Sequence, residues 1–215
     1  MSYLASGSVV RSSPVEPYRP SFFVQEVSDD LLKRSLRDTA MEWKGVAEEA
    51  SRRAGVQLER RRLCELSSIA SMVSREIDWG LSSSLDPTRI FACYDEESNL
   101  QSIATVKNVK DDLHVECLVT HPNNISSSSA GVKGSGTALM HHLFRKALDE
   151  NKKSITLLTL YQSESFYSRL GFEGTNARNM MITSEKIQSL LETRRCFSPK
   201  PAYPFAISPN TVTLV

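Results

Sequence analysis

The chain has 215 residues, of which 40% are hydrophobic and 24% charged, and its 26 basic and 25 acidic side chains leave a formal charge of +1. This balance is ordinary for a soluble globular protein, and it argues against a nucleic-acid or membrane-surface binder, which would carry a basic excess. No apolar run approaches the roughly 18 residues that a membrane-spanning helix needs. We therefore expect neither a nucleic-acid nor a membrane partner.

The two ends of the chain differ in composition from its middle. Residues 1–20 are rich in serine and proline and predict an arm without regular structure, and residues 191–215 form a second proline-rich segment. The arm lacks the apolar stretch of a secretory signal, although organelle transit peptides and bacterial secretion arms share its serine-rich, acid-poor start. We expect a cytoplasmic protein, with organelle targeting or secretion through the arm as alternatives.

The first predicted elements are a strand over 21–27 and two helices. Ser28 is the expected N-cap of the first helix, whose apolar side chains recur every three or four residues from Leu32 to Ala47. The second helix is expected over 56–77 with a similar apolar stripe.

From residue 90 onward, short apolar runs alternate with helical patterns. We expect strands at 90–94, 100–107, 113–120, 155–160 and 178–182, and helices at 135–150, 163–170 and 184–192. This order predicts a mixed α/β fold in a single domain over 21–190.

Neither the cysteines nor the histidines form a metal-binding pattern. The four cysteines are widely spaced, and Cys93 and Cys117 lie in apolar runs, which favours buried reduced thiols over disulfides. His141 and His142 are adjacent on a predicted helix and face different directions, so they cannot bind one metal. We therefore expect no metal site.

A glycine-containing turn precedes the helix predicted at 135–150. Such a turn presents free N–H groups and the positive end of the helix dipole, which bind phosphate oxygens. The stretch 131–136 reads G-V-K-G-S-G. It is not a Walker A loop, because Lys133 comes before Gly134, and Leu139 replaces the third glycine of the dinucleotide fingerprint. Ser135 has glycine directly on both sides, which excludes a G-x-S-x-G nucleophile elbow.

Three motifs in this order resemble the GCN5-related N-acetyltransferase (GNAT) family. The sequence LVTHP at 118–122 is similar to the family's fourth strand and its exit, and 131–136 is similar to its pyrophosphate loop. The sequence FYSRLGF at 166–172 is similar to its motif B. Gly131 departs from the pattern, since Gln or Arg usually stands there, and Lys133 is expected to supply that charge instead.

The resemblance implies a GNAT-like fold, with a central mixed β-sheet flanked by helices, and acetyl-CoA as cosubstrate. In such a protein, backbone N–H groups of the turn hold the pyrophosphate, while the end of the fourth strand pairs with the pantetheine arm and polarises the thioester carbonyl. The implied cofactor-binding residues are Leu118, Val119, Thr120, Val132, Lys133, Gly134, Ser135, Gly136 and Thr137.

The resemblance also implies catalytic roles. Tyr167 matches the motif B tyrosine that serves in many members as general acid near the sulfur of CoA, although simple aromatic packing is the alternative. Strand alternation places His114 and Glu116 on one face of their strand. His114 has the better intrinsic pKa, whereas Glu116 lies one pleat nearer the thioester, and both are candidates for the general base. His121, at the strand exit, is a third.

The function implied is transfer of an acetyl group from acetyl-CoA directly to a primary amine of a small molecule, a protein lysine or an N-terminus. A catalytically weakened acyl-CoA-binding module and a secreted effector acetyltransferase are the alternatives. Carboxylates on the first helix, Glu42, Glu48 and Glu49, would either attract a cationic acceptor or simply form a solvated face. We expect a monomer or a homodimer.

Overall fold

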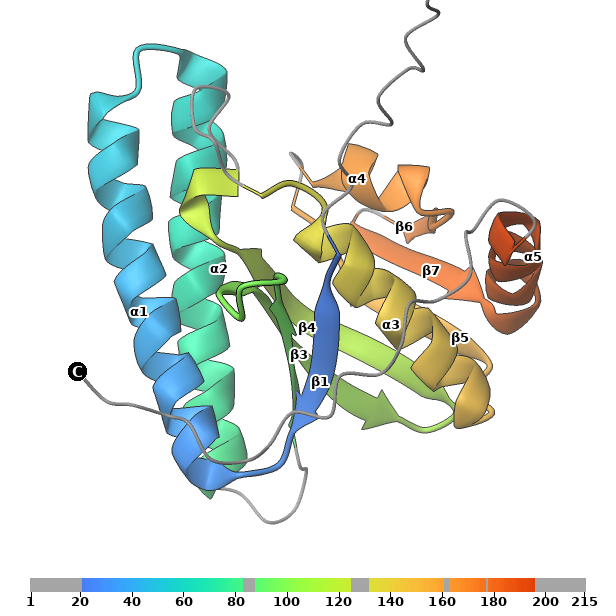
Figure 1. Ribbon diagram of the computed structural model, residues 1–215. Coiled ribbons are helices and arrows are strands. Elements are labelled where there is room, and N and C mark those ends of the chain that lie inside the picture. Colours follow the sequence, from blue (N-terminus) through green and yellow to red (C-terminus); the bar gives the residue numbers. More distant parts are fainter. Residues whose placement is uncertain (1–20, 83–87, 125–131, 161–162, 177, 196–215) are drawn as a thin grey trace, which may run out of the picture. The chain divides into compact units, whose positions relative to one another are not determined.

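The computed structural model describes residues 21–82, 88–124, 132–160, 163–176 and 178–195 (Figure 1). Within them, seven strands form one mixed sheet in the order β1-β2-β3-β4-β5-β7-β6. The predicted mixed α/β fold is therefore confirmed. The residues group into two compact units, the first within Met1–Thr105 and Cys117–Met140, the second within Val106–Glu116 and His141–Val215. Each unit is described by itself.

The first unit contains two long helices and the antiparallel pair β1–β2. Val24 of β1 lies opposite Cys93 of β2, and Val27 lies opposite Ile90. The elements are β1 (Phe23–Val27), α1 (Asp30–Arg53), α2 (Gln57–Ser82), β2 (Arg89–Tyr94), the first part of β3 (Leu100–Val109), the end of β4 (Asp112–Thr120), the 3-10 turn η1 (Pro122–Asn124) and the start of α3 (Ser135–Asp149).

Helix α1 begins one residue later than the sequence indicates. Asp29, not Ser28, is the N-cap, and its carboxylate accepts the backbone N–H of Leu32 at 2.8 Å. An aspartate at this position satisfies a free N–H group and also places a negative charge at the positive end of the helix. Both residue types favour the cap, so the sequence alone did not separate them.

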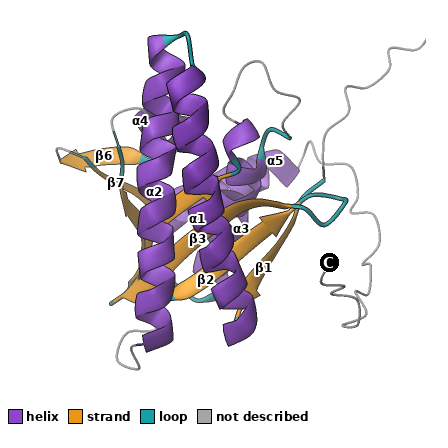
Figure 2. Cartoon of the chain, turned by 90° about the vertical axis from the view of Figure 1, so that its left-hand side faces the viewer, coloured by secondary structure: helices purple, strands orange, loops and turns teal. Residues whose placement is uncertain are grey.

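One face of α1 and one face of α2 are packed against the strands. Figure 2 shows the two helices side by side in front of β1, β2 and β3. The apolar stripes predicted from the sequence are buried in this core, which confirms their periodicity. Its members include Leu36, Ala40, Trp43 and Ala47 of α1, Leu63, Leu66, Ala70, Val73 and Ile77 of α2, and Ile90, Ala92, Ile103, Cys117 and Val119 of the strands.

The second unit contains a parallel and an antiparallel strand pair. Leu113 of β4 lies opposite Ile155 of β5 in the parallel ladder, and Ile155 lies opposite Ile182 of β7 in the antiparallel one. The elements are the first part of β4, the rest of α3, β5 (Ser154–Leu158), α4 (Glu164–Arg169), β6 (Glu173–Asn176), β7 (Asn179–Thr183) and α5 (Ser184–Arg195).

Strand β6 is absent from the sequence prediction. Its sequence EGTN contains no apolar residue, and all four residues are exposed. It is held by hairpin pairing with β7, in which Glu173 lies opposite Met181 and a register shift follows Gly174. Periodicity detects buried faces, so an edge strand without one gives no signal.

Two helices are longer than predicted, and the buried thiols agree with expectation. Helix α2 continues to Ser82, and α5 continues to Arg195, into the segment expected as a tail. Cys93 and Cys117 are buried, and burial raises the pKa of the Cys93 thiol to about 11. No helix in the described residues is both long and apolar enough to cross a bilayer, and they contain no cluster of three potential metal ligands.

Candidate functional site

The turn before α3 adopts a conformation that only glycine accepts readily. Gly134 has a φ of +111°, and a Cβ built there would lie 3.4 Å from the ring of Phe22. Its carbonyl accepts the N–H of Ala138 at 2.9 Å, which makes Gly134 the N-cap of α3. Helix geometry leaves the N–H groups from Gly134 to Thr137 without intrahelical acceptors, at the positive end of the helix. This is a suitable site for phosphate oxygens.

The side chains around the turn divide into inward and outward groups. Ser135 is 1% exposed and donates its hydroxyl to the carbonyl of Gln101 at 3.3 Å, so it offers the site only its N–H. Lys133 is exposed and forms no ion pair within the described residues. It is therefore available to a phosphate. Gly131 and the serine tract at 126–129 lie outside the described residues.

The end of β4 lies close to this turn within the first unit. Val119 is buried in the core, whereas Leu118 and Thr120 are half-buried and point to the opposite face of the strand. The next residue, His121, donates its N–H to the carbonyl of Gln101 at 2.8 Å, the same carbonyl that accepts the Ser135 hydroxyl. Two stretches of predicted cofactor-binding residues thus converge on one residue of β3.

The two predicted bases lie in the second unit, on the same face of β4. Glu116 forms an ion pair with Lys107 at 3.2 Å, and both side chains are half-buried. His114 lies opposite Thr156 in the ladder, and its Nδ1 is 2.8 Å from the Thr156 hydroxyl. Each side chain therefore already has a protein partner, and the alternation predicted for this strand is confirmed.

His121, the third candidate, lies beside Trp43. Its Nδ1 accepts the backbone N–H of Asn123 at 3.2 Å, and its ring meets Trp43 edge-on at 5.3 Å between centroids. Burial lowers the pKa of His121, although the carboxylate of Glu42 acts in the opposite direction. The Nδ1 of His121 therefore already has a protein partner.

Tyr167 lies in α4 and is 8% exposed. Its ring packs edge-on against Phe166 and Phe172, with centroid distances of 5.0 and 5.7 Å. Gly171, between these aromatic residues, has a φ of +98°, and a Cβ there would clash with Leu190 at 2.8 Å. The motif at 166–172 therefore forms a rigid aromatic turn that fixes the orientation of the tyrosine ring.

The comparisons with known proteins identify the fold. No family model matches the chain, and no curated protein matches it in sequence. Among solved structures, a Lactobacillus plantarum protein assigned to the N-acetyltransferases matches with a TM-score of 0.50 and 10% identity, over 76% of this chain and 98% of that one. A GNAT-family acetyltransferase from Staphylococcus aureus matches with a TM-score of 0.47 and 11% identity, over 76% and 99%. The PaiA N-acetyltransferase of Thermoplasma acidophilum, solved with coenzyme A, matches with 0.45 and 17%, over 75% and 96%.

The chain has the GNAT fold.

Cavities lined by described residues include one in the first unit and two in the second. In the first unit, a cavity of about 690 Å³ lies between α1, α2 and η1, next to the exit of β4. Its walls include Gly45, Glu49, Glu59, Leu63 and Pro122. Glu59 makes no ion pair within the described residues, whereas Glu49 is paired with Arg52 and Arg53 at 2.7 Å each.

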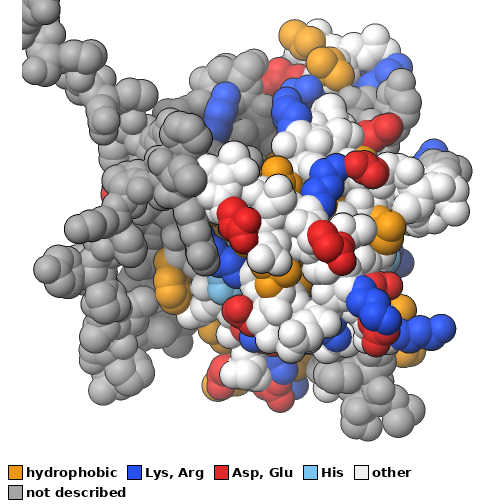
Figure 3. Space-filling view, turned by 90° about the vertical axis from the view of Figure 1, so that its right-hand side faces the viewer, with side chains coloured by type: hydrophobic (Ala, Val, Ile, Leu, Met, Phe, Trp, Pro, Cys, Tyr) orange, Lys and Arg blue, Asp and Glu red, His pale blue; other side chains and the backbone are white. Residues whose placement is uncertain are grey.

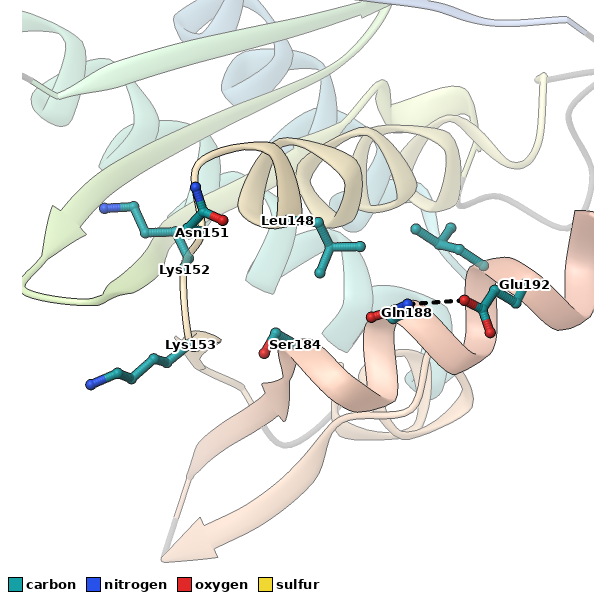
Figure 4. Close-up of a pocket in the computed structure, with 8 residues that line it drawn as sticks. Leu148, Asn151, Lys152, Lys153, Ser184, Gln188 and Glu192 are labelled. Carbon is teal, nitrogen blue, oxygen red and sulfur yellow. Dashed lines mark hydrogen bonds between the residues drawn. The ribbon is translucent and has the colours of Figure 1, made fainter.

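The other two cavities lie in the second unit. One of about 390 Å³ is lined by Thr159 at the end of β5, Glu164 of α4 and the β6–β7 hairpin. The other, of about 510 Å³, lies between the end of α3 and α5 (Figure 4). There Leu148 faces Gln188, which donates to Glu192 at 3.0 Å. None of the site residues predicted from the sequence lines this last cavity.

Sequence reasoning missed Gln101 as part of the candidate site. It stands at the start of an apolar strand, and no motif or spacing marks it. Its importance follows from three long-range hydrogen bonds, to residues between 20 and 34 positions away. A single sequence gives no signal for such contacts.

Proposed function

We propose that the protein is an acyl-CoA-dependent N-acyltransferase that transfers an acetyl group to a primary amine. One observation carries the proposal. The turn at Gly134 combines a positive φ, four N–H groups without helical acceptors and Lys133, which makes no ion pair with any described residue. The turn follows β4, whose end resembles the pantetheine-binding segment of the GNAT family, and this order supports the proposal.

The chain's own groups fit the charged part of coenzyme A. The N–H groups from Val132 to Thr137 would hold the pyrophosphate, and the ammonium of Lys133 would offset its charge in place of the side chain missing at Gly131. The backbone of Leu118 to Thr120 would pair with the pantetheine arm. Acetyl-CoA would supply the activated thioester, and the positioning and the proton transfers would fall to the protein.

Transfer requires the amine to lose a proton and the departing thiolate to gain one. We propose that the hydroxyl of Tyr167, whose ring is fixed by its aromatic neighbours, donates the proton to the departing thiolate. To take the proton from the amine, we favour the carboxylate of Glu116, which Lys107 keeps in place. The Nε2 of His114 is the alternative, since Thr156 engages the other ring nitrogen.

We propose that the acceptor enters the cavity between α1, α2 and η1. Its floor is apolar at Leu63 and Pro122, and Glu59 offers a carboxylate without an ion pair in the described residues. Glu48 does not contribute to such a site, because it accepts from Ser67 at 3.0 Å and lies 3.7 Å from Lys44. Small amines, lysine peptides and protein N-termini are all candidates. The face of the molecule in Figure 3, which is the right-hand side of Figure 1, carries both acidic and basic side chains.

The test is direct binding followed by turnover. We expect calorimetry to show acetyl-CoA binding, and expect release of free CoA when a panel of amines, peptides and aminoglycosides is added. Gly134→Asp should abolish binding, because the side chain is strained there and its charge repels phosphate. Gly174→Asp is the matched control, since nothing lies within 4 Å of a Cβ at that exposed position. Absence of binding by the wild-type protein would refute the proposal.

The weakened binding module remains the second candidate, favoured by the departure at Gly131. Both candidates predict CoA binding, but only the enzyme predicts CoA release. Tyr167→Phe separates them further. In the enzyme it should lower kcat by roughly 10²-fold, in the range of general acid–base catalysis, with little change in the affinity for CoA.

We propose a cytoplasmic location and a monomeric or dimeric state. Deletion of residues 2–20 with a fluorescent fusion tests the location, because an organelle-targeting or secretion arm would lose its destination on deletion. An unchanged distribution would leave the cytoplasmic proposal standing.

A further inference from the structure

Gln101 holds three separate parts of the first unit together. It is 7% exposed, and its carbonyl accepts the N–H of His121 at 2.8 Å and the hydroxyl of Ser135 at 3.3 Å. Its side-chain oxygen accepts the amide of Asn124 at 3.0 Å, and its side-chain nitrogen donates to the carboxylate of Asp95 at 2.8 Å. Both the backbone and the side chain of one residue are therefore engaged.

These partners stand at the two ends of one loop. His121 and Asn124 follow β4 directly, and Ser135 opens α3, while the serine tract lies between them in the sequence. The entropic cost of closing a loop rises only slowly with its length. Gln101 bonds both to the exit of β4 and to the start of α3. The distance between these two segments therefore depends far more on Gln101 than on the number of residues between them.

We propose that Gln101 is the positioning residue that holds the phosphate-binding turn of α3 in register with the end of β4. The proposal rests on the proposed function, because the register matters only if both segments bind one acyl-CoA. Donors must converge on a phosphate within a fraction of an ångström to be effective. Loss of the Gln101 side chain removes the acceptor of the Asn124 amide and one of several donors to Asp95, and it loosens the strand that carries the accepting carbonyl.

The test compares three variants with a matched control. Gln101→Leu removes both side-chain bonds, Asn124→Ala removes one, and Ser135→Ala removes the donor at the helix start. Asn99→Ala is the control, because Asn99 also bonds to Asp95, at 3.3 Å, but touches neither end of the loop. We expect Gln101→Leu to weaken CoA binding roughly tenfold and Asn124→Ala roughly threefold, with Asn99→Ala unchanged. The KM for acetyl-CoA should rise while kcat stays constant.

A double-mutant cycle and amide exchange make the result specific. Gln101→Leu and Asn124→Ala should be non-additive in the affinity for CoA, since they break one shared bond. Without ligand, Gln101→Leu should speed hydrogen exchange at the amides of Ser135 to Ala138, and Asn99→Ala should not. Deletion of Ser126 to Ser129 should leave the affinity within twofold of the wild type.

The outcomes are distinguishable. If the wild type binds no CoA, the proposed function fails and this inference fails with it. If the wild type binds but Gln101→Leu behaves like Asn99→Ala in affinity and exchange, only the positioning role is refuted. A fall in kcat as large as the rise in KM would show a general loss of structure and would also refute the positioning role.

Discussion

At the scale of single residues, Asp95 is the charge on which the hydrogen bonds around Gln101 depend. Burial raises the pKa of Asp95, but hydrogen bonds from Asn99, Glu97 and Gln101 outweigh this and leave it below the ordinary value of 3.8. A carboxyl whose folded-state pKa is depressed stabilises the fold above its unfolded-state pKa. That contribution is lost as the pH falls through the folded-state value.

Asp95→Asn should therefore lower the free energy of unfolding at pH 7 by about 1 kcal/mol, at the low end for charged hydrogen bonds because the carboxyl is partly exposed. The difference from the wild type should shrink below about pH 4, where Asp95 starts to be protonated. Urea denaturation at several pH values measures this. Glu97→Gln, on the same turn, is the control and should change stability little. A difference that stayed constant down to pH 3 would contradict the argument.

The residues of the site were predictable where a backbone constraint shows in the sequence. Gly134 was predicted to lie in a turn that opens a helix, and its positive φ shows that the backbone there favours glycine. Ser135 was expected in the same site, but its hydroxyl is turned inward to Gln101. Side-chain direction and long-range partners depend on the folded neighbourhood, which a motif does not encode.

At the scale of elements, a periodic pattern of apolar residues predicted the buried helices and strands reliably, whereas the lack of such a pattern did not exclude a strand. The stripes of α1 and α2 predicted the packed faces, and alternation predicted the pattern of β4. Strand β6 was missed because it buries no side chain, and the N-cap of α1 was misplaced by one residue because Ser28 and Asp29 are both good caps. The first difference arises because an exposed edge strand leaves no apolar pattern, and the second because two neighbouring residues are almost equal as N-caps.

Gly45 provides the prediction at this scale. It lies inside α1, where glycine costs about 1 kcal/mol relative to alanine, yet nothing lies within 4 Å of a Cβ there. It lines the cavity next to η1, so its missing side chain widens the proposed acceptor site. Gly45→Ala should raise the free energy of unfolding by up to about 1 kcal/mol.

Gly45→Leu should narrow the cavity and raise the KM for the acceptor severalfold, without changing the affinity for CoA. Thermal denaturation and steady-state kinetics measure the two effects. Met41→Leu, at an exposed position of the same helix outside the cavity, is the control. If the leucine variant kept the wild-type KM for every acceptor, the cavity would not be the acceptor site.

At the scale of the whole molecule, all the buried hydrophobic residues described lie between Val27 and Ile187. The helices and strands described run from Phe23 to Arg195. Composition predicted an arm over residues 1–20 and a proline-rich tail from residue 191, and α5 continues past the expected start of that tail. Within the described residues, the helices and strands other than β6 lie where apolar side chains recur.

A fragment of residues 21–195 should therefore fold and bind acetyl-CoA as the full chain does. It keeps Ser21, whose N–H donates to Glu96 at 3.0 Å, and Phe22, which packs on Gly134. A fragment that ends at residue 190 loses the last turn of α5, including Leu191, and should unfold at a lower temperature. Circular dichroism melts and calorimetry with acetyl-CoA compare the two fragments with the full chain. Weaker CoA binding by the 21–195 fragment would show that the arm or the tail contributes to the site, and equal melting temperatures for the two fragments would show that the end of α5 does not stabilise the fold.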